Sequence, residues 1–153
     1  MTKEHPSSDG SSRPDASVLR YLAWFRYRLR CFLRFSESAA RASGVTPQQY
    51  QLLLGILGYT GRGWATISEL AEFLQERHNA VVGLVDRAER RGLIRKEPGV
   101  NDRRFVRVRA TPRGEKVLKN LAKLHRRELA RLRLGLASVT QAQPKIIQQS
   151  KGA

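Results

Sequence analysis

The chain has 153 residues, and its 29 lysines and arginines exceed its 13 aspartates and glutamates to give a formal net charge of +16. Such an excess indicates a polyanionic partner, nucleic acid before an anionic membrane surface, with a generically basic surface as the alternative. Arginine supplies most of the charge, and its forked guanidinium matches phosphates and guanines. The length fits one domain, or one domain with an added dimerisation element.

A single cysteine, Cys31, excludes an internal disulfide and fits a reducing compartment. It falls well inside a predicted apolar helix, where a lone cysteine is more often inert packing than a redox sensor. No run approaches the roughly 20 apolar residues of a membrane span. We therefore expect a cytoplasmic protein with no membrane partner.

Residues 1–15 are rich in Ser, Pro, Gly and Asp, which predicts a flexible tail. A long helix is predicted next, within residues 16–44. Its apolar residues recur at alternating three- and four-residue steps, and Gly44 is typical of a helix end. The stripe contains Val18, Leu22, Phe25, Leu29 and Phe32.

Residues 45–111 are predicted to be a DNA-binding domain. Thr46, Pro47 and Gln49 form a helix start with a capping box, and we expect this helix to reach about Leu57. Two short amphipathic helices follow, close enough that their apolar stripes must pack together as a helix-turn-helix. The stripes are Ile67, Leu70, Ala71 and Leu74 in the first, and Val81, Leu84, Val85 and Ala88 in the second.

The second of these helices, about 77–91, is the predicted recognition helix. Residues 93–97 and 105–111 then predict two strands around a polar tip, and the hairpin makes a wing at 98–104. A basic helix is predicted at 112–137, with an apolar face that includes Val117 and Leu121. The Gln-rich segment 138–153 is expected to be weakly ordered.

The predicted fold class is mainly α with a small β-hairpin (α+β): a winged helix-turn-helix between long N- and C-terminal dimerisation helices. Over residues 17–136 the chain resembles the MarR (multiple antibiotic resistance regulator) family of winged-helix repressors. The resemblance implies a dimeric, DNA-binding transcriptional regulator. The segments that carry it are Val45–Tyr50, Ile67–Ala71, Gly83–Arg87, Arg91–Arg95, Asn101–Arg104 and Ala110–Gly114.

If the apolar stripe of the recognition helix faces the core, the opposite face should enter the major groove. Asn79 suits an adenine edge, His78 a guanine, and Val82 a thymine methyl group, while Gly83 permits close approach. Two alternatives stay open: Asn79 as a helix cap, and His78 as an exposed turn residue. Asp86 is expected to position Arg87 or Arg90 rather than touch DNA. The predicted DNA-binding residues are Arg77, His78, Asn79, Val82, Gly83, Arg87, Arg103, Arg104 and Arg107.

The wing follows from the family resemblance and from charge. The family's Asp-x-Arg signature implies that Asp102 braces the hairpin and that Arg104 enters the minor groove, where A·T tracts attract arginine. Arg107 and Arg109 share one strand face and are better suited to phosphates than to bases. The alternative for the tip is a solvated basic turn.

The apolar faces of the two long helices exceed what the reading module can cover, which predicts a homodimer. A two-fold dimer reads half-sites about 34 Å apart, so the operator should be pseudo-palindromic. Many family members release DNA on binding a small aromatic acid, and Trp24, Arg28 and Tyr50 are candidates to line such a cleft. The alternative is that these aromatics only pack.

Nothing in the sequence supports catalysis. The three histidines are scattered, and neither zinc-ligand spacing nor a phosphate-binding glycine loop is present. We therefore expect no enzyme activity, metal or cofactor. The sequence predicts a sequence-specific dimeric transcriptional repressor, and the alternative is a nonspecific architectural nucleic-acid-binding protein.

Overall fold

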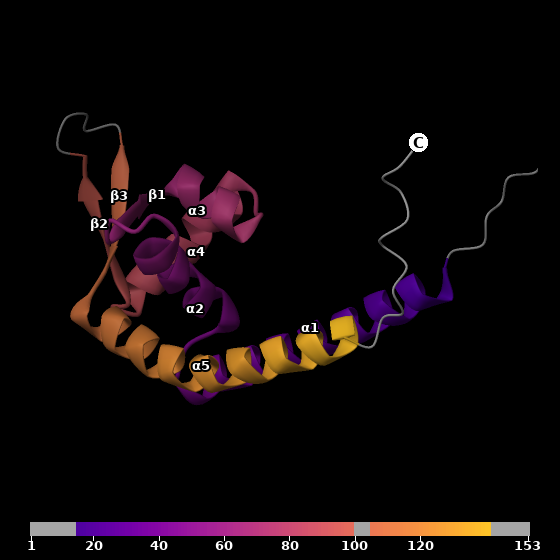
Figure 1. Cartoon of the computed structure of the whole chain (residues 1–153). Coiled ribbons are helices and arrows are strands. Elements are labelled where there is room, and N and C mark those ends of the chain that lie inside the picture. The colour runs from indigo at the N-terminus through magenta and orange to yellow at the C-terminus, as the bar shows by residue number, and fades with distance from the viewer. Residues whose placement is uncertain (1–14, 100–104, 142–153) are drawn as a thin grey trace, which may run out of the picture.

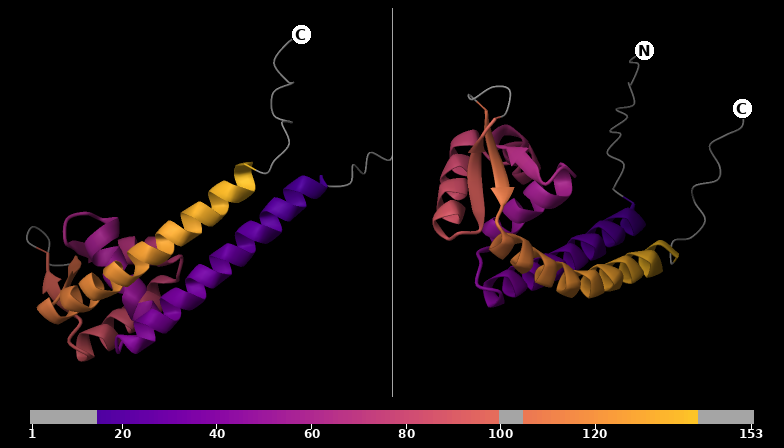
Figure 2. Two further views of the ribbon diagram at one scale, coloured as in Figure 1. Left: turned by 60° about the horizontal axis from the view of Figure 1, so that its bottom comes forward. Right: turned by 90° about the vertical axis from the view of Figure 1, so that its left-hand side faces the viewer.

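The computed structural model describes residues 15–99 and 105–141, with side chains to residue 135. Two long helices, α1 (Ala16–Ala42) and α5 (Pro112–Gln141), lie side by side, and a small head sits over one end of the pair (Figures 1 and 2). The first helix ends as predicted. The last continues to Gln141, so residues 138–141 prolong the helix instead of belonging to the predicted tail.

The head begins with α2 (Pro47–Leu54), which has the predicted capping box: the Gln49 amide donates to Thr46 Oγ1 at 3.1 Å, and the Thr46 amide donates to Gln49 Oε1 at 3.0 Å. The helix was expected to reach about Leu57. Instead the chain widens after Leu54 into a π-helical turn, η1 (Gly55–Tyr59).

A three-stranded antiparallel sheet completes the head, in the order β1-β3-β2. The predicted hairpin is confirmed as β2 (Ile94–Pro98) and β3 (Val106–Ala110), with Lys96 opposite Val108. The sequence did not predict β1 (Trp64–Thr66), which pairs with β3. Three residues are too few to show an alternating pattern, so this strand depends on its partner.

The helix-turn-helix is confirmed as α3 (Ile67–Leu74) and α4 (His78–Arg90). Its predicted stripes face inward: all four stripe residues of α4 are buried, while Leu70 is the only fully buried one of the four in α3. Burial of such side chains stabilises the fold by about 1.5–3 kcal/mol each. The largest fully buried side chains are Leu52, Leu53, Ile56, Leu70, Leu93, Ile94, Leu121, Val81, Val85 and Val108.

The long helix α5 is attached tightly to the head at its first turn. The Thr111 amide donates to the Leu93 carbonyl at 3.0 Å, and Thr111 Oγ1 donates to the Gly92 carbonyl at 2.6 Å. Gly114 lies so close to the same Leu93 carbonyl that a β-carbon there would overlap it. These contacts join the start of α5 directly to the start of β2.

His125 fills the junction of α1, α2 and α5, a role that the sequence did not reveal. It is only 4% exposed. Its Nδ1–H donates to the Leu121 carbonyl at 2.8 Å, because a carbonyl oxygen only accepts, and Nε2 accepts from Ser36 Oγ at 2.8 Å. The Tyr50 ring stacks on the imidazole at 4.9 Å between centroids. The junction is therefore both packed and hydrogen-bonded.

Replacing His125 with alanine should lower the free energy of unfolding by about 2–4 kcal/mol, because the change leaves a cavity and an unpaired Ser36 hydroxyl. Urea denaturation followed by circular dichroism measures the loss. His78→Ala is the matched control, since His78 is exposed on α4 and should change stability by no more than about 0.5 kcal/mol. Equal losses in the two variants would contradict the role given to His125.

Candidate nucleic-acid interface

The turn between α3 and α4 presents the start of the recognition helix to solvent. The turn begins at Gln75, which is left-handed with φ 53°, and Arg77 occupies the N-cap position of α4 without a side-chain cap. The cap alternative for Asn79 is therefore not what the structure shows: Asn79 is the second residue of the helix. The first-turn N–H groups of α4 are left to solvent or to a bound anion.

The predicted groove-facing residues of α4 lie together on its exposed side, in two rows. His78, Val82 and Asp86 border a cavity of about 460 Å³ between α4 and the wing strands. Asn79, Gly83 and Arg87 border a second cavity, of about 300 Å³, on the side of α2. One exposed helix face thus combines a histidine, an asparagine and a valine, which suits reading base edges.

Gly83 allows Arg87 to lie back along the helix. A β-carbon at Gly83 would sit 3.3 Å from Arg87 Nη1, the mobile end of a long side chain. The guanidinium of Arg87 therefore lies over Gly83, one helical turn closer to the start of α4, in the space that a larger side chain at this position would occupy. This arrangement places the charge of Arg87 near Asn79 at the edge of the predicted DNA surface.

Gly83→Ala should raise the free energy of unfolding by about 0.5–1 kcal/mol, because alanine is the better helix former and Arg87 can move aside. Gly92→Ala is the control, since Gly92 ends α4 with φ 67°, where alanine is strained by about 1 kcal/mol or more. Urea denaturation of both variants should give shifts of opposite sign. A loss of stability in Gly83→Ala would show that the Arg87 position is rigid.

Asp86 does not act as the sequence suggested. Its carboxylate was expected to position Arg87 or Arg90, but Lys96 Nζ donates to Asp86 Oδ1 at 2.8 Å and lies 3.2 Å from Glu89 Oε2. The reason is β2, which runs beside α4 and brings Lys96 over both acids. The hydrogen bond from Lys96 lowers the pKa of Asp86, and its counterpart raises the pKa of Lys96. These ion pairs join α4 to β2, and the two carboxylates offset the positive charge of Lys96.

The same cluster predicts a pH dependence. Because the pKa of Asp86 is lowered in the folded state, its contribution is complete above the unfolded value of about 4 and is lost as pH falls through the lower folded value. Lys96→Met should therefore be less stable than the parent near pH 7, and the difference should shrink below about pH 4. Denaturation at a series of pH values measures it. Lys119→Met, at an exposed position on α5, should show no such convergence.

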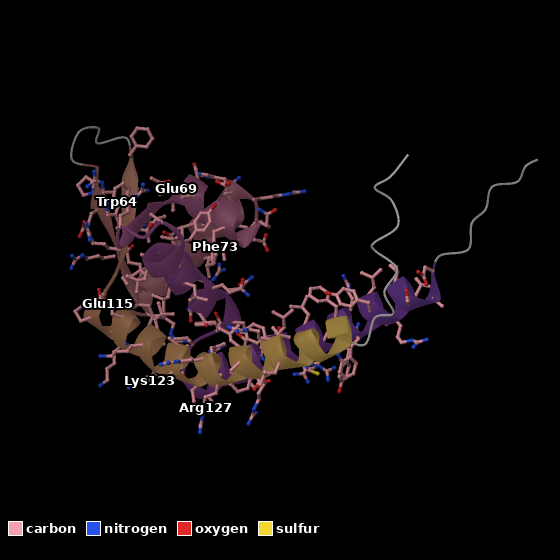
Figure 3. All side chains as sticks on the ribbon, in the orientation of Figure 1. Trp64, Glu69, Phe73, Glu115, Lys123 and Arg127 are labelled. Carbon is pink, nitrogen blue, oxygen red and sulfur yellow. The ribbon has the colours of Figure 1, made fainter. Side chains whose placement is uncertain are left out.

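Most cations on the outer face of the sheet contact an acidic or aromatic side chain of this chain. The indole of Trp64 lies between two guanidiniums, that of Arg62 at 3.7 Å and that of Arg107 at 4.3 Å from its ring centroid. Arg62 also pairs with Glu69, and Figure 3 shows Trp64 and Glu69 at the same end of the head. Arg109 donates to Glu97 at 3.1 Å. This face is a network in which acids offset most of the charge.

Three predicted cations stay available for an anionic partner. Arg77 and Arg87 make no salt bridge with any residue in the described part of the chain, and Arg107 has only its contact with Trp64 there. All three belong to α4, its cap or β3. Arg77 and Arg87 stand beside His78 and Asn79 on α4, whereas Arg107 lies against Trp64 on the outer face of the sheet.

The predicted wing tip lies outside the described residues. This includes Asp102, Arg103 and Arg104, so their roles stay predictions. The hairpin is closed just before the tip, where the Gly99 amide donates to the Phe105 carbonyl at 2.7 Å. Phe105 is 60% exposed and lines the larger cavity opposite His78 and Val82. Strict alternation would put Phe105 on the same strand face as Arg107 and Arg109, so the sequence pattern does not reveal this position.

The structure does not bring the three proposed effector residues together. Tyr50 is buried against His125, whereas Trp24 Nε1 donates to the Gly135 carbonyl at 3.4 Å and Arg28 Nη2 to the Arg131 carbonyl at 2.9 Å. Tyr50 belongs to the junction under the head, whereas Trp24 and Arg28 lie further out, where α1 contacts α5. Within this chain the Tyr50 ring stacks on His125 and the Trp24 ring stacks on Tyr27.

In the described part of the chain, no helix is both long and apolar enough to cross a membrane. The same residues contain no group of three or more His, Cys, Asp or Glu side chains arranged to hold a metal ion.

Comparison with known proteins identifies the head. Residues 43–104, which include α2, α3, α4 and β2, match the model of the MarR family. The head is therefore similar to the domain that defines the MarR family. Members of this family are transcriptional regulators, and the observed winged helix is the MarR fold, with long helices and a small antiparallel sheet.

Individual relatives agree with this assignment. The transcriptional activatory protein BadR of Rhodopseudomonas palustris is 27% identical over 123 residues, which is 80% of this chain and 70% of BadR. The MarR-family regulator AbsC of Streptomyces coelicolor superposes with a TM-score of 0.69 at 19% identity, covering 86% of this chain and 90% of AbsC. A point mutant of MepR from S. aureus, solved bound to an oligodeoxyribonucleotide, gives 0.60 at 18% identity, covering 82% of this chain and 85% of MepR.

Proposed function

We propose that this protein is a sequence-specific transcriptional regulator that binds duplex DNA through α4 in the major groove and the wing, residues 98–104, in the minor groove. The observation that carries the proposal is the exposed face of α4. There His78, Asn79 and Val82 stand beside two arginines without salt-bridge partners among the described residues. The DNA-bound MepR relative supports this use of the fold.

Selectivity and affinity come from different residues in this proposal. Arg77, Arg87 and Arg107 hold phosphates, which position the protein without reading sequence. His78 and Asn79 read base edges, where a good bidentate contact is worth about 1–3 kcal/mol of discrimination. Lys96 contributes little to either, because Asp86 and Glu89 already neutralise it.

A homodimer is the functional form in this proposal. Helices α1 and α5 leave a series of large apolar side chains exposed, which favours a second copy as the cover. A two-fold pair would present two α4 helices to a pseudo-palindromic operator. The exposed residues are Val18, Leu19, Leu22, Phe25, Leu33, Leu124, Leu129 and Leu134.

Repression by occupying the operator is the simplest outcome of such binding. Activation is a second candidate, because the relative BadR is named an activatory protein. A reporter gene placed downstream of the selected operator separates the two by the sign of the response. A small aromatic effector gains no support from the described residues, because Trp24, Arg28 and Tyr50 do not converge.

Selection of bound duplexes from a random pool at fixed salt tests the proposal. It should enrich a pseudo-palindromic site, and His78→Ala or Asn79→Ala should each weaken binding to that site by about 1–3 kcal/mol while leaving affinity for unselected DNA unchanged. Asn120→Ala, an exposed asparagine on α5, is the matched control and should bind as the parent does.

Two outcomes contradict the proposal. A pool that yields no enriched sequence would favour the alternative, a nonspecific architectural nucleic-acid-binding protein. An operator that the His78 and Asn79 variants bind as selectively as the parent would show that α4 is not the reading element.

A further inference from the structure

Most of the positive charge of the chain lies outside the reading head. Residues 43–111 contain 11 basic and seven acidic side chains, a net charge of only +4. Helix α1 contains six arginines and one glutamate, and α5 contains eight basic and two acidic residues, so the two helices together carry +11 of the total +16. The proposed function of α4 and the wing leaves this charge without a role.

Five of the eight cations of α5 gather on one side of the helix, here named the α5 basic face: Lys116, Lys119, Lys123, Arg126 and Arg127. At about 100° per residue, these five fall within about a third of the helix circumference. The opposite side holds Val117, Leu121 and His125, which pack against the rest of the molecule. The row from 116 to 127 is about 16 Å long.

The α5 basic face is open to solvent and uncompensated. All five side chains are exposed, and none forms a salt bridge with another described residue. Figure 3 shows Lys123 and Arg127 on the side of α5 that points away from α3, α4 and the sheet. DNA held by α4 and the wing would therefore leave this face uncovered.

The residue types on and around the α5 basic face indicate which kind of partner it can bind. A helix that binds a membrane surface needs Trp, Phe or Leu beside its cations. Between residues 116 and 130 this sector holds only Ala130 besides the cations, with Asn120 at its edge, and the exposed Leu124 and Leu129 lie outside it. Single-stranded nucleic acid is held by stacking on aromatic rings, and the face has none. A second copy would bring like charges together. Duplex DNA, with one phosphate charge per about 1.7 Å of its axis, fits a plain row of cations.

We propose that the α5 basic face binds the phosphate backbone of a second DNA duplex, so that the protein joins two duplex segments on opposite sides of the α1–α5 layer. The second contact reads no sequence, because lysines and arginines on a solvated helix face hold phosphates without reaching base edges. The joining of two duplexes rests on the proposed function, which supplies the first duplex.

A capture experiment with the full chain tests this inference. One duplex, carrying the selected operator, is fixed to beads, and retention of a second, fluorescent duplex of unrelated sequence is measured at fixed low salt. The variant K116Q/K119Q/K123Q/R126Q/R127Q should retain at least about tenfold less second duplex, while its affinity for the fixed operator stays within about threefold. Loss of five phosphate contacts should also reduce the slope of log affinity for the second duplex against log salt concentration by about 4.5.

Matched variants keep the result interpretable. K116R/K119R/K123R preserves the charge at the same positions and should capture the second duplex as the parent does. K119Q/K123Q/R127Q should give an intermediate loss. Because glutamine is a good helix former and all the positions are exposed, circular dichroism should be unchanged in each variant.

Three outcomes overturn the inference: the five-site variant captures the second duplex as well as the parent; it loses the fixed operator to the same degree; or it loses binding to phosphatidylserine vesicles but not to DNA. Unchanged capture by the five-site variant would mean that the second duplex binds the α4 surface of another copy of the chain. The variant R77Q/R87Q/H78A tests the proposed function separately. If it still binds the operator selectively, that function fails, even where the five-site variant shows that α5 binds DNA.

Discussion

Burial of the inner stripe of α4 determines the rest of the reading head. With Val81, Leu84 and Val85 held in the core, the 3.6-residue repeat leaves only one side of the helix for a partner. That side carries His78 and Asn79. The same burial presses α4 against β2 and so brings Lys96 over two acids that would otherwise extend into solvent. Core packing thus determines which residues of α4 face outward and which cations are already paired with acids.

Electrostatics divides the molecule into two regions of different character. In the head, acidic side chains pair with Arg62, Arg95, Lys96 and Arg109, and the described arginines without a salt bridge include Arg77 and Arg87 on the exposed side of α4. Along the two long helices there is little such compensation. A protein built in this way has a selective surface of modest charge and a larger surface of high charge, and the two should respond differently to salt.

The sequence predicted those parts of the fold that repeat or that are signalled locally. The apolar stripes of α3 and α4, the capping box at Thr46 and the β2–β3 hairpin all belong to this class. What it missed depends on contacts between distant segments. Strand β1 exists because β3 pairs with it, and His125 is buried because Ser36 and Tyr50 come from other helices. The spacing of apolar residues along the chain does not show which distant segments will contact each other.

The attachment of α5 to the head has a mechanical consequence. The helix starts against the Leu93 backbone, through Thr111 and the close approach of Gly114, and then runs without a break to Gln141. Thirty residues of helix form a lever arm of about 45 Å, so a tilt of about 5° at its base would displace the far end by about 4 Å. Small adjustments of the head to its binding partner would therefore be amplified at the outer end of the long helices.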